Sequence, residues 1–95
     1  MNPQYIRMDS RRLVDKTNAA RFDLAWTEVE LALTFCRLAR DTADPTKRAR
    51  NIVNAKTAYQ GALKLLADVD LPVPVHLGPL LTDAERELAM LDVQL

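Results

Sequence analysis

The sequence predicts an all-α protein in which an antiparallel helical hairpin, a proline-rich strap and a C-terminal helix form a three-helix bundle. Three observations support this fold class. Apolar residues recur at helical spacing in two long segments. An Asp-Pro pair typical of the start of a helix lies between them, and a capping box begins a third apolar segment. A chain of 95 residues is too short for two hydrophobic cores. We therefore expect a single helical domain spanning residues 1–95.

The first long helix is expected from Arg21 to about Arg40, because no proline or glycine interrupts this stretch. The segment before it is a candidate short N-terminal helix. Ser10 could cap a helix that continues into the long one, whereas Thr17 and Asn18 offer a later start or a break. The sequence leaves both possibilities open.

The first helix carries two apolar stripes when its residues are placed about 100° apart. The stripe expected to face the core is Phe22, Trp26, Val29, Leu33 and Cys36. A second stripe lies nearly opposite and consists of Leu24, Leu31, Phe35 and Leu38, continued backwards by Ala20 and Leu13. Three alanines line one flank between the stripes (Ala25, Ala32 and Ala39), and only the flank with Asp23, Thr27, Glu30, Thr34 and Arg37 is polar. Because a surface helix has one apolar stripe, the second must be covered by this bundle or by another molecule.

The second helix is expected from Pro45 to about Asp68, since Asp44 is a good N-cap and proline is tolerated at the first helical position. The short connection before it predicts an antiparallel hairpin with the first helix. Its apolar stripe is Ile52, Ala55, Tyr59, Ala62, Leu63 and Leu66. Gly61 lies opposite this stripe, so we expect it to face solvent.

Prolines dominate the segment from Val69 to Leu80, which is therefore expected to be an extended strap along the hairpin. The third helix is expected to begin at Thr82, where Thr82 and Glu85 form a capping box. Its apolar face is Leu81, Ala84, Leu88, Leu91 and Leu95. This face should pack on the hairpin.

The run Ala55-x-x-x-Tyr59-x-x-Ala62-Leu63 resembles the second helix of a tetratricopeptide repeat, in which small residues and an aromatic lock a helical hairpin. The signature of that family's first helix would fall in the predicted turn, and no second copy follows at a 34-residue period. The resemblance therefore covers one helix. It implies a hairpin fold and protein binding, and it assigns no functional residue.

Charge is unevenly distributed although the formal net charge is zero. Residues 37–64 carry seven basic side chains and two acidic ones, whereas residues 65–95 carry six acidic side chains and one basic one. We expect the acidic segment to lie against the basic segment of the same chain or of a second copy. The alternative is a nucleic-acid-binding surface formed by Arg37, Arg40, Lys47, Arg48, Arg50 and Lys56. A sequence pI near 6.6 and the lack of interleaved aromatic residues disfavour it.

Catalytic, metal-binding and cofactor-binding residues are not expected. Cys36 and His76 are the only residues of their kinds, Cys36 lies on the predicted core stripe, and His76 lies in the strap. There is no glycine-rich phosphate loop and no apolar run long enough to span a bilayer. We expect a cytoplasmic protein without enzymatic activity, small-molecule substrate or membrane partner.

The function predicted from these patterns is protein–protein interaction or self-association. The expected interaction residues are Leu24, Leu31, Phe35 and Leu38, and the expected partner is a second copy or another helical protein. Trp26 and Tyr59 lie centrally on their stripes, so we interpret them as core residues. The alternative function is a small nucleic-acid-binding regulator.

Overall fold

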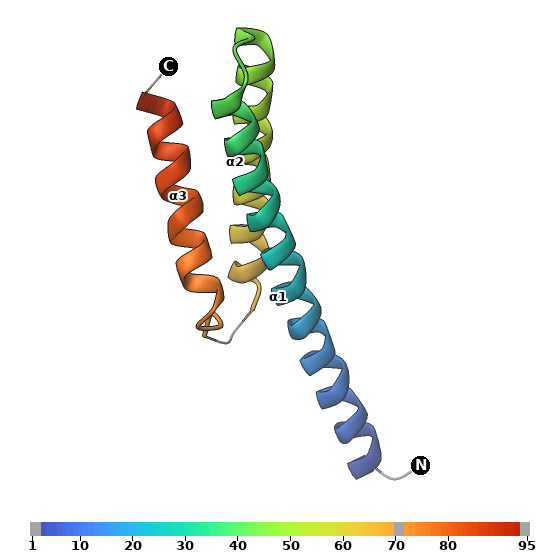
Figure 1. Ribbon diagram of the computed structural model, residues 1–95. Helices are drawn as coiled ribbons and strands as arrows, with labels where there is room; N and C mark the ends of the chain where they lie inside the picture. The colour runs from blue at the N-terminus through green and yellow to red at the C-terminus, as the bar shows by residue number, and fades with distance from the viewer. Residues whose placement is uncertain (1–2, 70–71, 94–95) are drawn as a thin grey trace.

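The computed structural model describes residues 3–69 and 72–93, and the side chains of residues 17–69 and 72–91. Over these residues the chain forms three helices and no strand (Figure 1). They are α1 (Pro3–Asp41), α2 (Pro45–Ala67) and α3 (Leu77–Val93). The all-α, three-helix fold is as predicted.

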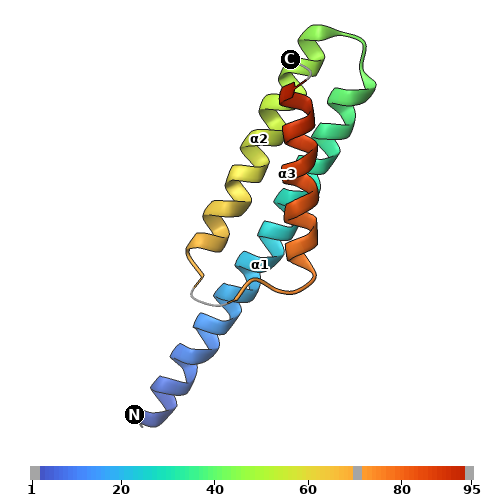
Figure 2. The ribbon, with the colours of Figure 1, turned by 90° about the vertical axis from the view of Figure 1, so that its left-hand side faces the viewer.

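Helix α1 is a single helix of 39 residues. It begins at Pro3 and continues through Thr17 and Asn18, so the open question about the N-terminal segment is answered by one uninterrupted helix. A helix of this length spans roughly 58 Å. Its N-terminal turns project beyond α2 and α3, and only the C-terminal half of α1 lies alongside them (Figure 2).

The predicted helical hairpin is formed by α1 and α2, which run antiparallel (Figure 1). The Asp44 carboxylate accepts hydrogen bonds from the backbone N–H groups of Thr46 (2.9 Å) and Lys47 (3.3 Å), which is an N-cap of α2. Arg48 then donates from its guanidinium to the carbonyl oxygens of Ala39 (3.2 Å) and Thr42 (2.9 Å). The turn therefore satisfies carbonyl groups that the end of α1 leaves without intrahelical partners.

Helix α3 begins at Leu77, and the predicted start at Thr82 was wrong. Pro79 lies in the first turn, where a backbone N–H has no intrahelical acceptor and its loss does no harm. The Thr82 hydroxyl lies within the helix and donates to the Gly78 carbonyl (3.1 Å) instead of capping a new one. The strap is correspondingly shorter than predicted.

The centre of the core is a row of small residues on α1. The buried residues of this inner row are Ala25, Val29, Ala32, Cys36 and Ala39. Four of them, all except Ala32, form two clusters with Ile52, Ala55 and Ala62 of α2 and with Leu77, Ala84, Leu88 and Leu91 of α3. Ala58 of α2 is buried as well. The predicted core stripe was therefore wrong in detail, because Phe22, Trp26 and Leu33 are only half-buried. Small side chains let two helix backbones approach closely, which places the alanines at the contact and the larger residues around it.

Two predictions about α2 were also wrong. Leu63 is exposed although it was placed on the core stripe. Gly61 faces α1 and not solvent, since a Cβ atom on it would lie 3.5 Å from Oε2 of Glu28. Ala55 and Ala62 are buried and Tyr59 packs against both core clusters, as expected for a hairpin core. The relation of α2 to tetratricopeptide repeats stays a prediction.

Candidate interaction surface

The outward face of α1 carries a row of residues that alternate three and four positions apart. We call this row the outer seam: Leu24, Thr27, Leu31, Thr34 and Leu38. All five are exposed, and the leucines keep 54%, 41% and 48% of their surface in contact with solvent. The spacing is that of the a and d positions of a coiled-coil heptad. Because the inner row has the same spacing, α1 carries two helix-packing faces, of which one is used.

The two threonines of the outer seam have satisfied hydroxyl groups. Thr27 donates to the Asp23 carbonyl (3.1 Å) and Thr34 to the Glu30 carbonyl (2.9 Å), in each case within α1. A hydroxyl that is buried without a partner destabilises a protein by a few kcal/mol, whereas a satisfied one does not. The outer seam could therefore be covered by another helix without leaving an unpaired hydroxyl.

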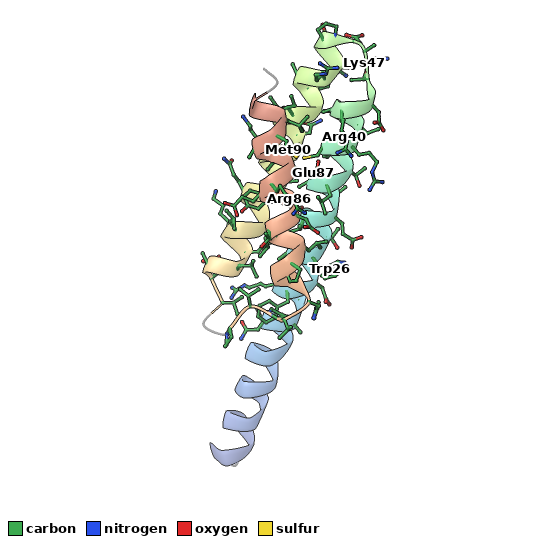
Figure 3. All side chains as sticks on the ribbon, turned by 60° about the vertical axis from the view of Figure 1, so that its left-hand side comes forward. Trp26, Arg40, Lys47, Arg86, Glu87 and Met90 are labelled. Atoms are coloured by element: carbon green, nitrogen blue, oxygen red, sulfur yellow. The ribbon has the colours of Figure 1, made fainter. Side chains whose placement is uncertain are left out.

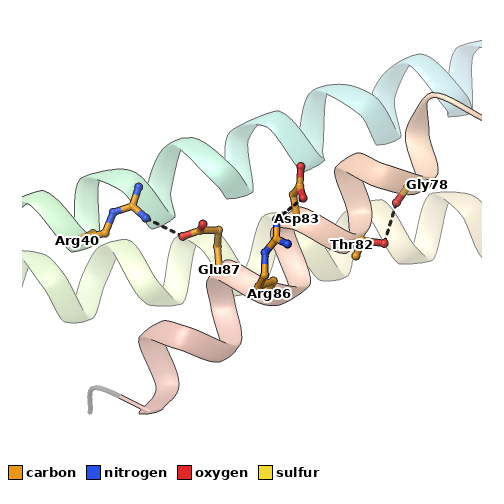
Figure 4. A network of polar contacts seen from close by, with 6 residues as sticks. All are labelled: Arg40, Gly78, Thr82, Asp83, Arg86 and Glu87. Atoms are coloured by element: carbon orange, nitrogen blue, oxygen red, sulfur yellow. Dashed lines mark hydrogen bonds and ion pairs between the residues drawn. The ribbon is translucent and has the colours of Figure 1, made fainter.

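Helix α3 covers a different side of α1. Arg40 of α1 forms an ion pair with Glu87 of α3 (2.9 Å, Figure 4), and Leu33 packs against the core cluster that includes α3 residues. Arg40 and Leu33 lie well over 90° around α1 from Leu31 at about 100° per residue. The outer seam thus lies on the face of the hairpin away from α3.

Phe35 does not share the exposure of the three leucines with which it was grouped. It is half-buried and packs against the cluster that contains Cys36, Ile52 and Ala55. The predicted interaction set is therefore corrected to Leu24, Leu31 and Leu38, with Phe35 contributing to the hairpin core. The threonines between these leucines were missed because they were assigned to a polar flank. The signal that could have found them is their three- and four-residue spacing from the leucines.

Charged residues flank the outer seam on both sides. One flank carries Asp23, Glu30 and Arg37, and the other carries Arg21 and Glu28 next to α2. Arg21 donates to the Asp68 carbonyl (3.1 Å), and the Glu28 carboxylate lies beside Gly61. Asp23, Glu30 and Arg37 make no side-chain ion pair with the residues whose side chains are described.

A shallow groove of about 260 Å³ lies between α1 and α3. Its lining residues are Leu33, Arg37, Arg40, Asp83, Arg86 and Glu87. Four of them form two ion pairs, Arg40 with Glu87 and Arg86 with Asp83 (Figure 4). The groove is largely neutralised by its own side chains, and Arg37 is the lining cation outside these pairs.

The six residues of the predicted basic surface have different roles. Arg40 is paired with Glu87, and Arg48 is bound to the end of α1. Lys47 lies at the hairpin turn, well away from the Arg40–Glu87 pair (Figure 3). The expected attraction between the basic and acidic segments is present within this chain, at the Arg40–Glu87 pair.

Cys36 and His76 lie in different parts of the molecule, Cys36 in the core and His76 exposed before the start of α3. The Cys36 thiol is buried with Leu88 and Leu91, and burial, followed by the nearby Glu87 carboxylate, raises its pKa above the usual value. The His76 ring packs on Trp26, with ring centroids 5.3 Å apart. Among the described residues, no three His, Cys, Asp or Glu side chains are placed to hold a metal ion.

The described geometry defines the class of this protein as a small three-helix all-α protein with one unused packing face on its longest helix. None of its described helices has both the length and the apolar character required to cross a bilayer. Comparisons with family models, curated proteins and solved structures give no match to this chain.

Proposed function

We propose that this protein is a helical interaction module that self-associates through the outer seam of α1. The observation that carries the proposal is the exposure of three leucines at heptad spacing, alternating with threonines whose hydroxyls are already bonded. Residues of this kind are typical of a helix–helix contact and are unusual on a surface that faces only water.

The leucines supply a substantial but limited driving force. Full burial of a leucine contributes roughly 1.5–3 kcal/mol. About half of each leucine is still exposed, so the six leucines of a dimer would contribute on the order of 7 kcal/mol in total. Association itself costs about 4–15 kcal/mol in lost freedom. The leucines alone therefore offset little more than the lower end of this cost, and we expect a weak dimer that also needs the other contacts of the outer seam.

Nucleic-acid binding is less well supported. A cation that is held by a carboxylate or by a helix end is not free to neutralise a phosphate, and Arg40 and Arg48 are held in these ways. The seam leucines, in contrast, have no alternative role in the described part of the chain. Self-association is the function that the geometry favours.

Light scattering and sedimentation velocity over about 5–500 µM protein would test the proposal. The wild-type protein should change from monomer to dimer over this range. Leu31→Asp should stay monomeric throughout, because it places a charge at the middle of the outer seam. Its circular dichroism should remain helical, since Leu31 is not part of the core.

Val53→Asp is the matched control. Val53 is an exposed apolar residue of α2 that lies outside the outer seam, so its replacement introduces the same charge elsewhere. This variant should dimerise like the wild type. A wild-type protein that remains monomeric at the highest concentration would contradict the proposal, and so would equal effects of the two variants.

A further inference from the structure

The charges that flank the outer seam carry information about the partner. We infer that a second copy of this chain docks on the outer seam with its α1 antiparallel, so that Arg37 of each copy faces Asp23 of the other. This inference rests on the proposed self-association and goes further by assigning the orientation and the contacts of the partner.

The heptad positions follow from the outer seam. Leu24, Leu31 and Leu38 take the a positions, and Ala20, Thr27 and Thr34 take the d positions. The g flank then consists of Asp23, Glu30 and Arg37, and the e flank consists of Arg21, Glu28 and Phe35. All six a and d residues are exposed, so this face can receive a second helix along its whole length.

A parallel partner would be opposed by charge. In a parallel pair, each g residue meets the e residue five positions further along the other helix. Asp23 would then face Glu28, and symmetry would repeat this like-charge contact on the other side of the dimer. Glu30 would face Phe35, which is already packed in the hairpin core. A parallel arrangement therefore offers two repulsive contacts between the flanks and no ion pair from these positions.

An antiparallel partner matches both size and charge. In an antiparallel pair, a residues pack against d residues, so one register places a smaller residue opposite every leucine. The pairs are Leu24 with Thr34, Leu31 with Thr27, and Leu38 with Ala20. The same register brings Asp23 of each copy beside Arg37 of the other, which gives two symmetric ion pairs. Two like-charge contacts remain near the dyad, one between the two Glu30 residues of the g flanks and one between the two Glu28 residues of the e flanks, whereas a parallel pair has its two repulsive contacts and no ion pair to offset them.

Arg37 is available for this role. Its neighbours in the groove, Arg40 and Arg86, are held by carboxylates of α3. Arg37 is exposed and has no ion pair among the described side chains, and the same is true of Asp23. Both partners of the inferred contact are therefore unpaired in the single chain.

Charge reversal at Asp23 distinguishes the two orientations by the sign of its effect. In the antiparallel dimer, Asp23→Arg places two arginines together and should weaken dimerisation about tenfold at low salt. In a parallel dimer the same substitution would face Glu28 and strengthen association. Arg37→Asp should weaken the antiparallel dimer to a similar extent, and the double variant Asp23→Arg with Arg37→Asp should recover the wild-type dissociation constant.

Sedimentation equilibrium of the four proteins at about 50 mM and 500 mM salt provides the readout, and the differences should shrink at the higher salt. Circular dichroism confirms that each variant is folded. A stronger Asp23→Arg dimer, or no recovery in the double variant, would overturn the antiparallel register while Leu31→Asp still tests self-association. A wild-type protein without any dimer would overturn both.

Discussion

A threonine on a helix surface can be either a polar residue or part of a packing face, and the partner of its hydroxyl decides which. In α1, Thr27 and Thr34 bond back to carbonyl groups four residues earlier. Each threonine then offers its methyl group for packing. The two threonines therefore occupy the d positions of the heptad whose a positions are the leucines. This local hydrogen bond is the reason that a flank classified as polar can form part of a helix–helix contact.

The buried thiol of Cys36 makes a prediction at the same scale. Its raised pKa means that the folded protein favours the protonated form more strongly than the unfolded chain does. This preference stabilises the fold below the ordinary thiol pKa of about 9, and the stabilisation is lost as pH rises through the raised value. Urea unfolding should therefore give a lower free energy of unfolding at pH 10 than at pH 7.

Cys36→Ala is the control for this loss. It removes the thiol and should reduce the pH dependence, although Tyr59, whose pKa is raised first by burial and then by Glu85, contributes in the same direction at higher pH. The Cys36 thiol should also react with a thiol reagent much faster in urea than in buffer. Equal reaction rates in the two solvents would show that the side chain is accessible in the folded protein.

At the scale of the elements, α1 differs from an ordinary surface helix because it has two packing faces. The inner row meets α2 and α3, and the outer seam lies on the opposite side of the hairpin. Helix α3 is shorter than α1 and covers a side of α1 different from the outer seam. The hairpin is therefore covered on one face, and the other face is left for a partner.

Helix α2 contains a glycine whose replacement should stabilise the protein. A Cβ atom at position 61 would make an ordinary contact of 3.5 Å with the Glu28 carboxylate, and the backbone there is helical. Glycine in a helix is less favourable than alanine by about 1 kcal/mol. Gly61→Ala should therefore raise the free energy of unfolding by about 0.5–1 kcal/mol in urea titrations.

The matched control is Gly78→Ala. Gly78 lies in the first turn of α3, and a Cβ atom there would touch nothing within 4 Å. Alanine gains less at a helix end than in the interior, so the control should stabilise the protein less. A destabilising Gly61→Ala would show that α1 and α2 pack more tightly at Glu28 than the structure describes.

At the scale of the whole molecule, the basic and acidic segments are joined within one chain. The Arg40–Glu87 ion pair connects them, and its arginine comes from the end of α1. An exposed pair of this kind contributes little to stability, roughly 0–1 kcal/mol. Its larger consequence is that one of the six candidate phosphate-binding residues has a partner inside the protein.

This arrangement predicts weak, nonspecific nucleic-acid binding at most. Electrophoretic mobility shifts with several DNA and RNA sequences at about 150 mM salt should show no sequence-dependent complex. The informative variant is Lys47→Ala with Arg50→Ala, because both side chains are exposed and neither forms an ion pair with the side chains that the structure describes. A sequence-dependent shift that this variant abolishes would favour the nucleic-acid-binding alternative over self-association.

The sequence by itself determined the helical class, the hairpin and its Asp44 cap, and the leucines of the outer seam. Each of these depends on short-range spacing or on a local hydrogen bond. Only the tertiary structure decided that the inner row is the most deeply buried part of α1 and that Phe35 packs against α2. It also decided that Arg48 closes the end of α1. Periodicity gives the angle of a residue around its helix, but the directions and distances of the neighbouring helices determine which angles are buried.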